Sequence, residues 1–236
     1  MQNKVCLIKQ PAGVGDIFFC QKAAKFLRDK FGCSSIKWPV ISEFEWLRDY
    51  ITDIDFCNID SIKMPAGNNI IQTDDFIYVP LQDADQHMLD QSVMVSKYKF
   101  CGIGFSDWSN FLNIRRNTER EQQLKSKVLR DIGTKEFAFV NKIYGSPPAS
   151  VTCKYMDNIK TDLPVVELSY IPGITLIDWS IILEMATSIY TVETSLNFII
   201  EVLNTTTDLH MFSKHSPPSF SQIDMLFNKP WVYHYD

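Results

Sequence analysis

The chain has 236 residues, a length that suits one large α/β domain or two compact ones. Hydrophobic residues make up 45% of the sequence and charged residues 22%, which excludes disorder as the dominant state. The formal net charge of −5 argues against nucleic-acid binding through a basic surface.

The cysteines and histidines form no disulfide or metal-binding pattern. Six cysteines are spread singly without a C-x-x-C pair, and four histidines lack H-x-x-x-H spacing. We therefore expect reduced, mostly buried thiols and no metal site. The first residues hold no apolar segment of signal-peptide length, and no apolar run approaches the roughly 20 residues that span a bilayer. These features favour a cytoplasmic protein without a transmembrane segment.

The first half of the chain alternates short apolar runs with helical patterns. Strands are expected at 5–8, 35–40, 55–59 and 76–79. One helix is expected from 17 to 31, ended by Gly32, and another opens at Ser42, which forms a capping box with Glu45. Strands that alternate with helices predict a parallel sheet covered on both faces.

The pattern begins again after a charged helix that ends at Gly133. Strands are expected at 137–141, 164–168 and 188–192, with helices through Met185 and over 196–203. We therefore predict an α/β protein of two small Rossmann-like domains, residues 1–134 and 135–236, whose parallel sheets face a cleft.

A glycine loop follows the first expected strand. Gly13 and Gly15 let the backbone approach a ligand, and Asp16 stands at the start of a helix, where anions also bind. The loop is not a complete G-x-G-x-x-G motif, because residue 18 is Phe, and no Gly-Lys-Ser/Thr follows it. The simpler interpretation, that Asp16 only stabilises the helix terminus, stays open.

A second loop, Glu193–Thr194–Ser195, joins an expected strand to an apolar helix. Hydroxyls and free amides at a helix N-terminus form a phosphate site, and helix capping is the alternative. Like the glycine loop, it lies beyond the carboxyl end of a strand, where open α/β sheets bind ligands. Lys142, after the strand that ends at Asn141, either contributes positive charge or is merely solvated.

These segments resemble GT-B glycosyltransferases related to the heptosyltransferases. Residues 13–17 are similar to the family's G-x-G-D opening, and 174–186 and 190–203 to its second-domain helix, strand, turn and helix. The family turn begins with Asp where this chain has Glu193. The resemblance implies an acceptor-binding N-terminal domain, a donor-nucleotide-binding C-terminal domain, and Asp16 as the base that deprotonates the acceptor. It implies donor and phosphate binding by Gly13, Gly15, Lys142, Glu193, Thr194 and Ser195.

Three further groups are weaker candidates. A polar cluster is a candidate acceptor site or else a charged surface; it includes Lys97, Asp107 and Arg115. Residues after the last apolar helix are candidates for lining the cleft: His210, Lys214 and His215. Asp83-x-Asp85 resembles the metal-binding motif of GT-A glycosyltransferases, but its loop context favours no metal.

We therefore expect a metal-independent glycosyltransferase that moves a sugar from a nucleotide-sugar donor to a glycan or other hydroxyl acceptor. The nucleotide sugar is a substrate, and no cofactor is expected. Two alternatives remain open. A non-catalytic nucleotide- or sugar-binding module would bind without transfer, and a nucleotide-sugar epimerase would leave a nucleotide sugar as product.

Overall fold

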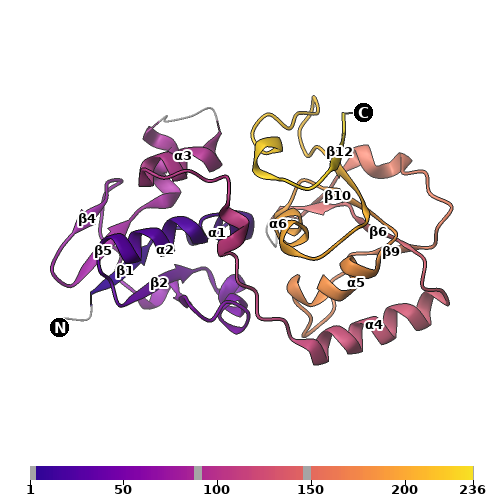
Figure 1. Cartoon of the computed structure of the whole chain (residues 1–236), viewed down its shortest axis with the longest axis horizontal. Coiled ribbons are helices and arrows are strands. Elements are labelled where there is room, and N and C mark those ends of the chain that lie inside the picture. The colour runs from indigo at the N-terminus through magenta and orange to yellow at the C-terminus, as the bar shows by residue number, and fades with distance from the viewer. Residues whose placement is uncertain (1–3, 88–91, 146–149, 236) are drawn as a thin grey trace. The chain divides into compact units, whose positions relative to one another are not determined.

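The chain forms two compact units, Met1–Arg115 and Arg116–Asp236 (Figure 1). This computed structural model describes residues 4–87, 92–145 and 150–235. The sequence pattern places the boundary later, at 134/135, and the difference is helix α4 (Thr118–Ile132). Leu124 and Val128 of α4 are buried. Arg116, just before the helix, pairs at 2.7 Å with Glu184 of α5 (Ser180–Met185), so α4 belongs with the second unit.

The first unit is built on a five-stranded sheet in the order β3-β2-β1-β5-β4. Four of these strands run parallel: β1 (Val5–Ile8), β2 (Ser35–Val40), β3 (Asp55–Asn58) and β5 (Phe76–Val79). The two-residue strand β4 (Ile71–Gln72) pairs antiparallel with β5 at one edge. The four strands expected from the sequence are confirmed, and β4 is too short to show an apolar pattern.

The helices of this unit differ more from expectation. The single helix expected over 17–31 is two helices, α1 (Val14–Phe19) and α2 (Gln21–Lys30), which meet at Cys20. The prediction of a capping box between Ser42 and Glu45 is wrong. Residues 42–49 form a 3₁₀ helix, and the Ser42 hydroxyl donates instead to the Glu43 carboxylate at 2.9 Å. Helix α3 (Val93–Cys101) was not expected, and it ends at Gly102 in the left-handed conformation.

An aromatic core joins α1 to α3. The rings of Phe19 and Tyr98 lie 4.7 Å apart, and Trp108 packs edge-on against Phe19 at 5.6 Å. The Tyr98 hydroxyl donates to the Phe19 carbonyl at 2.5 Å, which satisfies a polar group that is fully buried. Burial raises the pKa of Tyr98 far above its usual value. This packing fixes the position of α3 against the end of α1.

The second unit is built on a five-stranded parallel sheet in the order β12-β11-β10-β6-β9. Its strands are β6 (Ala138–Asn141), β9 (Val165–Glu167), β10 (Ser188–Val192), β11 (Asp208–Phe212) and β12 (Trp231–His234). Helix α6 (Ser195–Val202) follows β10 directly. The strands β6, β9 and β10 are confirmed within a residue of expectation. Strands β11 and β12, and the hairpin of β7 (Ile143–Tyr144) and β8 (Val151–Thr152), were not expected.

Two properties expected from the sequence concern thiols and membrane segments. All six cysteines, each in the described part of the chain, are unpaired, and five of them are buried. The expected burial of most thiols is thus confirmed, and their reduced state stays a prediction. Among the described residues, no helix combines the length and apolar character needed to cross a bilayer.

A ladder of stacked rings crosses β10, β11 and β12. Tyr190 stacks on His210 at 4.6 Å, and Phe212 stacks on His234 at 4.3 Å. The two imidazoles are joined by a hydrogen bond of 2.9 Å between His210 Nδ1 and His234 Nε2. Burial, and then the neighbouring His234 ring, lower the pKa of His210 below its usual value, and Asp208 opposes this shift.

This lowered pKa predicts a pH dependence of stability. The unfolded chain binds a proton at His210 at higher pH than the folded one, so the stability present above about pH 6.5 is lost as the pH falls. We expect His210→Phe, which keeps a stacked ring but cannot titrate, to lose less Tm than the wild type between pH 7.5 and pH 5.5. Thermal unfolding followed by circular dichroism measures this. His215→Phe, at a half-exposed position, is the control; equal slopes for wild type and His210→Phe would contradict the prediction.

Candidate functional site

Both candidate loops lie where the strand order of a sheet reverses. In the first sheet, β1 lies between β2 and β5, and the glycine loop (residues 9–16) leaves its carboxyl end. In the second sheet, β10 follows β9 along the chain but lies on the other side of β6, and the Glu193 turn (Glu193–Ser195) leaves β10. Open α/β sheets bind ligands at such points, because neighbouring loops diverge there and leave a crevice.

The glycine loop needs Gly13 for two reasons. Its φ of +80° lies in the left-handed region, and a Cβ at this position would come within 2.5 Å of Asp16 Oδ2. Gly15 lies in the first turn of α1, as does Asp16. Gly13 therefore permits a tight loop in which the Asp16 carboxylate lies close to the backbone of residue 13.

A buried lysine holds this carboxylate. Lys97 of α3 is 2% exposed, and its Nζ pairs with Asp16 Oδ1 and donates to Gln10 Oε1 at 2.8 Å. Gln10 in turn donates from Nε2 to the Ala12 carbonyl at 2.6 Å, and its own carbonyl accepts from Trp38 Nε1 at 2.9 Å. A buried ammonium requires such partners, so Lys97 ties the loop backbone and the carboxylate into one network. The Asp16 side chain itself remains 28% exposed and reachable by a ligand.

The Glu193 turn is ordered by a capping box. Thr194 is the N-cap of α6; its hydroxyl accepts from the Leu196 amide at 3.3 Å, and its own amide donates to Asn197 Oδ1 at 2.8 Å. Asn141, the last residue of β6, donates from Nδ2 to the same hydroxyl at 3.3 Å. Thr194 thus caps α6, which is the alternative that the sequence left open for this turn. Through its hydrogen bond with Asn141 it also links the end of β6 to the turn after β10. Ser195 stands at the first helical position, partly exposed.

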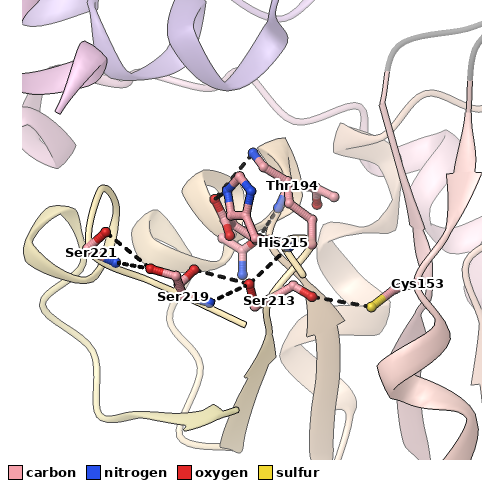
Figure 2. Close-up of polar contacts among 9 residues, drawn as sticks. Cys153, Thr194, Ser213, His215, Ser219 and Ser221 are labelled. Atoms are coloured by element: carbon pink, nitrogen blue, oxygen red, sulfur yellow. Dashed lines mark hydrogen bonds and ion pairs between the residues drawn. The ribbon is translucent and has the colours of Figure 1, made fainter. Parts of the chain in front are cut away.

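The loop after β11 brings two basic side chains, those of Lys214 and His215, to Glu193. Lys214 Nζ lies 3.2 Å and His215 Nε2 3.9 Å from Glu193 Oε1. The loop is held by Ser213, whose Oγ accepts from the amides of His215 and Ser219 at 3.0 Å each (Figure 2). This arrangement brings together Glu193 and two residues that the sequence offered only as candidates for lining a cleft.

A pocket of about 240 Å³ opens at this carboxylate. Its lining consists of Glu193, His215, Ser219, Ser221 and Gln222. Glu193 is 6% exposed, and its second oxygen, Oε2, is buried without a hydrogen-bond partner among the described residues. A buried carboxylate oxygen in this state lacks a donor, and ligand hydroxyls supply such donors.

Three other predicted site residues have partners outside the glycine loop and the Glu193 turn: Lys142, Asp107 and Arg115. Lys142 pairs with Glu167 of β9 at 3.5 Å rather than with the Glu193 turn. Asp107 pairs with Lys22, and the Arg115 guanidinium donates to the Asp49 carbonyl at 2.9 Å. The structure therefore brings Lys97 to Asp16 but gives Asp107 and Arg115 other partners, and their acceptor role stays a prediction.

The Asp-x-Asp motif does not present two free carboxylates. Asp83 pairs with Lys9 at 2.7 Å, and the side chain of Asp85 lies outside the described part of the chain. Within residues 4–87, 92–145 and 150–235, no group of three or more His, Cys, Asp or Glu side chains is arranged to hold a metal ion. Burial raises the pKa of Cys6 and of Cys20 to about 12, so neither thiol is a nucleophile near neutral pH.

Three of these polar residues were missed in the sequence: Gln10, Asn141 and Ser213. Gln10 and Asn141 stand at or just after the carboxyl end of an apolar strand, where a side chain reaches the edge at which open α/β sheets bind ligands, and this position is the signal that finds them. Ser213 follows β11, whose mixed polarity gives no such signal.

Comparison with known structures identifies proteins of the same fold. The chain superposes over its whole length on 88% of the glycosyl transferase family 9 protein from Veillonella parvula DSM 2008, with a TM-score of 0.51 and 9% sequence identity. It superposes over 99% of its length on 63% of TibC, described as an iron-containing dodecameric glycosyltransferase from enterotoxigenic E. coli H10407, with a TM-score of 0.52 and 12% identity. The chain thus spans less than two thirds of TibC.

These similarities lie in the structure alone. No protein-family model matches the sequence, and no curated protein matches it either. The two-unit α/β architecture with parallel sheets is the fold that the resemblance to GT-B glycosyltransferases implied, and at the level of fold the resemblance is confirmed.

The capping box at Thr194 predicts a defined loss of stability. Thr194→Ala removes the hydroxyl that accepts from Leu196 and Asn141, so we expect the free energy of unfolding to fall by about 1 kcal/mol. Thr194→Ser keeps the hydroxyl, and we expect it to retain most of the free energy of unfolding that Thr194→Ala loses. Urea denaturation of the three proteins measures the difference, and an unchanged midpoint for Thr194→Ala would contradict it.

Proposed function

We propose that this protein is a glycosyltransferase that moves a sugar from a nucleotide-sugar donor to a hydroxyl acceptor. The observation that carries the proposal is the Asp16 carboxylate, held by the buried Lys97 ammonium at the strand-order reversal of a sheet that occurs in glycosyltransferases. The first unit then binds the acceptor, and the second binds the donor. Unpaired thiols suit a reducing compartment, and we assign the protein to the cytoplasm on that basis.

Asp16 is the proposed general base. As the acceptor oxygen attacks the anomeric carbon of the donor sugar, Asp16 takes the hydroxyl proton, and the bond from that carbon to the diphosphate breaks. The nucleoside diphosphate leaves with the bonding electrons. Lys97 is a positioning residue, because its contacts to Asp16 and Gln10 fix the carboxylate against the loop.

The Glu193 turn is the proposed donor site. The first amides of the eight-residue helix α6 supply the partial positive charge that a departing diphosphate requires. Lys214 adds a full positive charge beside the turn, and Lys142 follows the neighbouring strand β6. The unpartnered Oε2 of Glu193 is suited to accept a hydrogen bond from a donor hydroxyl. The proposal assigns leaving-group stabilisation to these groups and not to a metal ion.

Substitution of the base tests the proposed chemistry. We expect Asp16→Asn to lower the rate of sugar transfer by a factor of about 10² to 10⁴ and to leave binding of a nucleoside diphosphate unchanged, since the proposed donor site, the Glu193 turn, belongs to the other unit. The control is Asp53→Asn, because Asp53 also pairs with a lysine of the first unit, Lys25, at 2.6 Å. Release of nucleoside diphosphate measures transfer, and calorimetry measures binding.

Each outcome separates the proposal from its alternatives. Unchanged transfer in Asp16→Asn would refute the assignment of the base. Nucleotide-sugar binding by the wild type with no transfer to any acceptor would point to a binding module. Conversion of one nucleotide sugar into another, without free nucleotide, would point to an epimerase.

Chelation tests the assignment of charge stabilisation to protein groups. If the α6 terminus and Lys214 stabilise the diphosphate, 5 mM EDTA leaves the transfer rate unchanged, whereas Lys214→Gln weakens nucleoside-diphosphate binding and Lys214→Arg restores most of it. Loss of transfer with EDTA, restored by a divalent cation, would show that a metal ion takes part.

A further inference from the structure

One face of the first sheet carries a pocket that is separate from the glycine loop. Side chains alternate along a strand, so Cys6 and Ile8 of β1 point to one face and Val5 and Leu7 to the other. The Cys6 face is covered by α2, since the Cys6 thiol reaches the Ala24 carbonyl at 4.0 Å. On the other face, a pocket of about 420 Å³ opens.

The pocket is largely apolar. Its apolar lining comes from the sheet and from the segment that passes over it: Val5, Leu7, Ile62, Met64, Pro65 and Phe76. Val5 and Phe76 are direct neighbours in the β1–β5 ladder and form part of one continuous apolar surface. Both are only partly buried, although parallel sheets in α/β proteins normally have both faces covered. The volume lies within the range of roughly 300–1,000 Å³ found for small-molecule sites.

The polar lining favours a negatively charged ligand. Two lysines, Lys37 and Lys63, line the pocket together with one acid, Asp75. The Lys37 ammonium is held only loosely, 3.9 Å from Asp55 Oδ2, and its side chain is 38% exposed. Lysines cover apolar surface with their methylene stems and present their charge at its border. The charged lining residues, two lysines and one aspartate, thus give the apolar pocket a net charge of +1, and Lys37 also faces Asp55, which is not among the lining residues.

We propose that this pocket binds a single-chain fatty carboxylate. Its alkyl chain lies on Val5, Leu7 and Phe76, and its carboxylate pairs with Lys37 and Lys63. The site begins at the amino ends of β1 and β5, whereas the glycine loop leaves the carboxyl end of β1. Binding here is therefore independent of the proposed glycosyl transfer.

Calorimetric titration of the full chain with decanoate, below its micelle concentration, tests the proposal. We expect saturable binding of one decanoate per chain, and none of decylammonium, which has the same chain length and the opposite charge. Lys37→Gln with Lys63→Gln is expected to weaken binding about fivefold to tenfold, which corresponds to two partly exposed ion pairs. Val5→Trp fills the pocket and is expected to abolish binding.

Two controls keep the result interpretable. Lys127→Gln with Lys135→Gln removes the same charge from the surface of the second unit and is expected to leave the affinity unchanged. Circular dichroism and an unchanged Tm show that Val5→Trp folds; if it does not, Met64→Trp, on the covering segment, replaces it.

Three results would overturn the proposal. They are equal binding of decanoate and decylammonium, decanoate affinity that is unaffected by either the lysine or the tryptophan variants, and no decanoate binding together with a dimer that Val5→Trp dissociates. The last result would assign the face to a second copy of the chain.

Discussion

The reversal of strand order in two parallel sheets is the constraint on which the candidate site depends. A parallel strand can be reached only by a crossover, so each sheet grows outward from a central strand in one direction and then in the other. The loops that leave β1 and β10 therefore diverge from their neighbours at the carboxyl edge. Every polar contact described for the glycine loop and the Glu193 turn is made at one of these two edges.

The two edges differ in the charge that they bury: an ammonium at the first and a carboxylate at the second. At the first, a nearly inaccessible ammonium is placed inside the protein, and its cost is offset by the Asp16 carboxylate and the Gln10 amide. At the second, Glu193 is the buried charge, and Lys214 and His215 approach one of its oxygens while the other has no partner in the described structure. One edge thus presents a positioned carboxylate, and the other a carboxylate with unused hydrogen-bonding capacity.

Much of the architecture was predictable because its signals are local. Apolar runs bounded by glycine, proline or polar residues predicted β1, β2, β5 and β10 at their observed bounds. Local signals failed where pairing decides the outcome. β11 and β12 have mixed polarity; β11 pairs with the edge of β10, and β12 pairs in turn with β11. The helix around Cys20 breaks, and α4 joins the second unit, for reasons of packing that a periodic pattern does not contain.

Local patterns along the chain were enough to locate its turns from strand to loop to helix, and hence to place Asp16 and Glu193 at the carboxyl ends of strands. Which groups contact these two carboxylates depends on the folded arrangement of each unit. Lys97 is 81 residues from Asp16, and Asn141 is 53 residues from Thr194. Such contacts depend on strand order and on the packing of α3, which arise from interactions across the whole unit. A spacing pattern reports only neighbours along the chain, and it therefore identified the loops but not their partners.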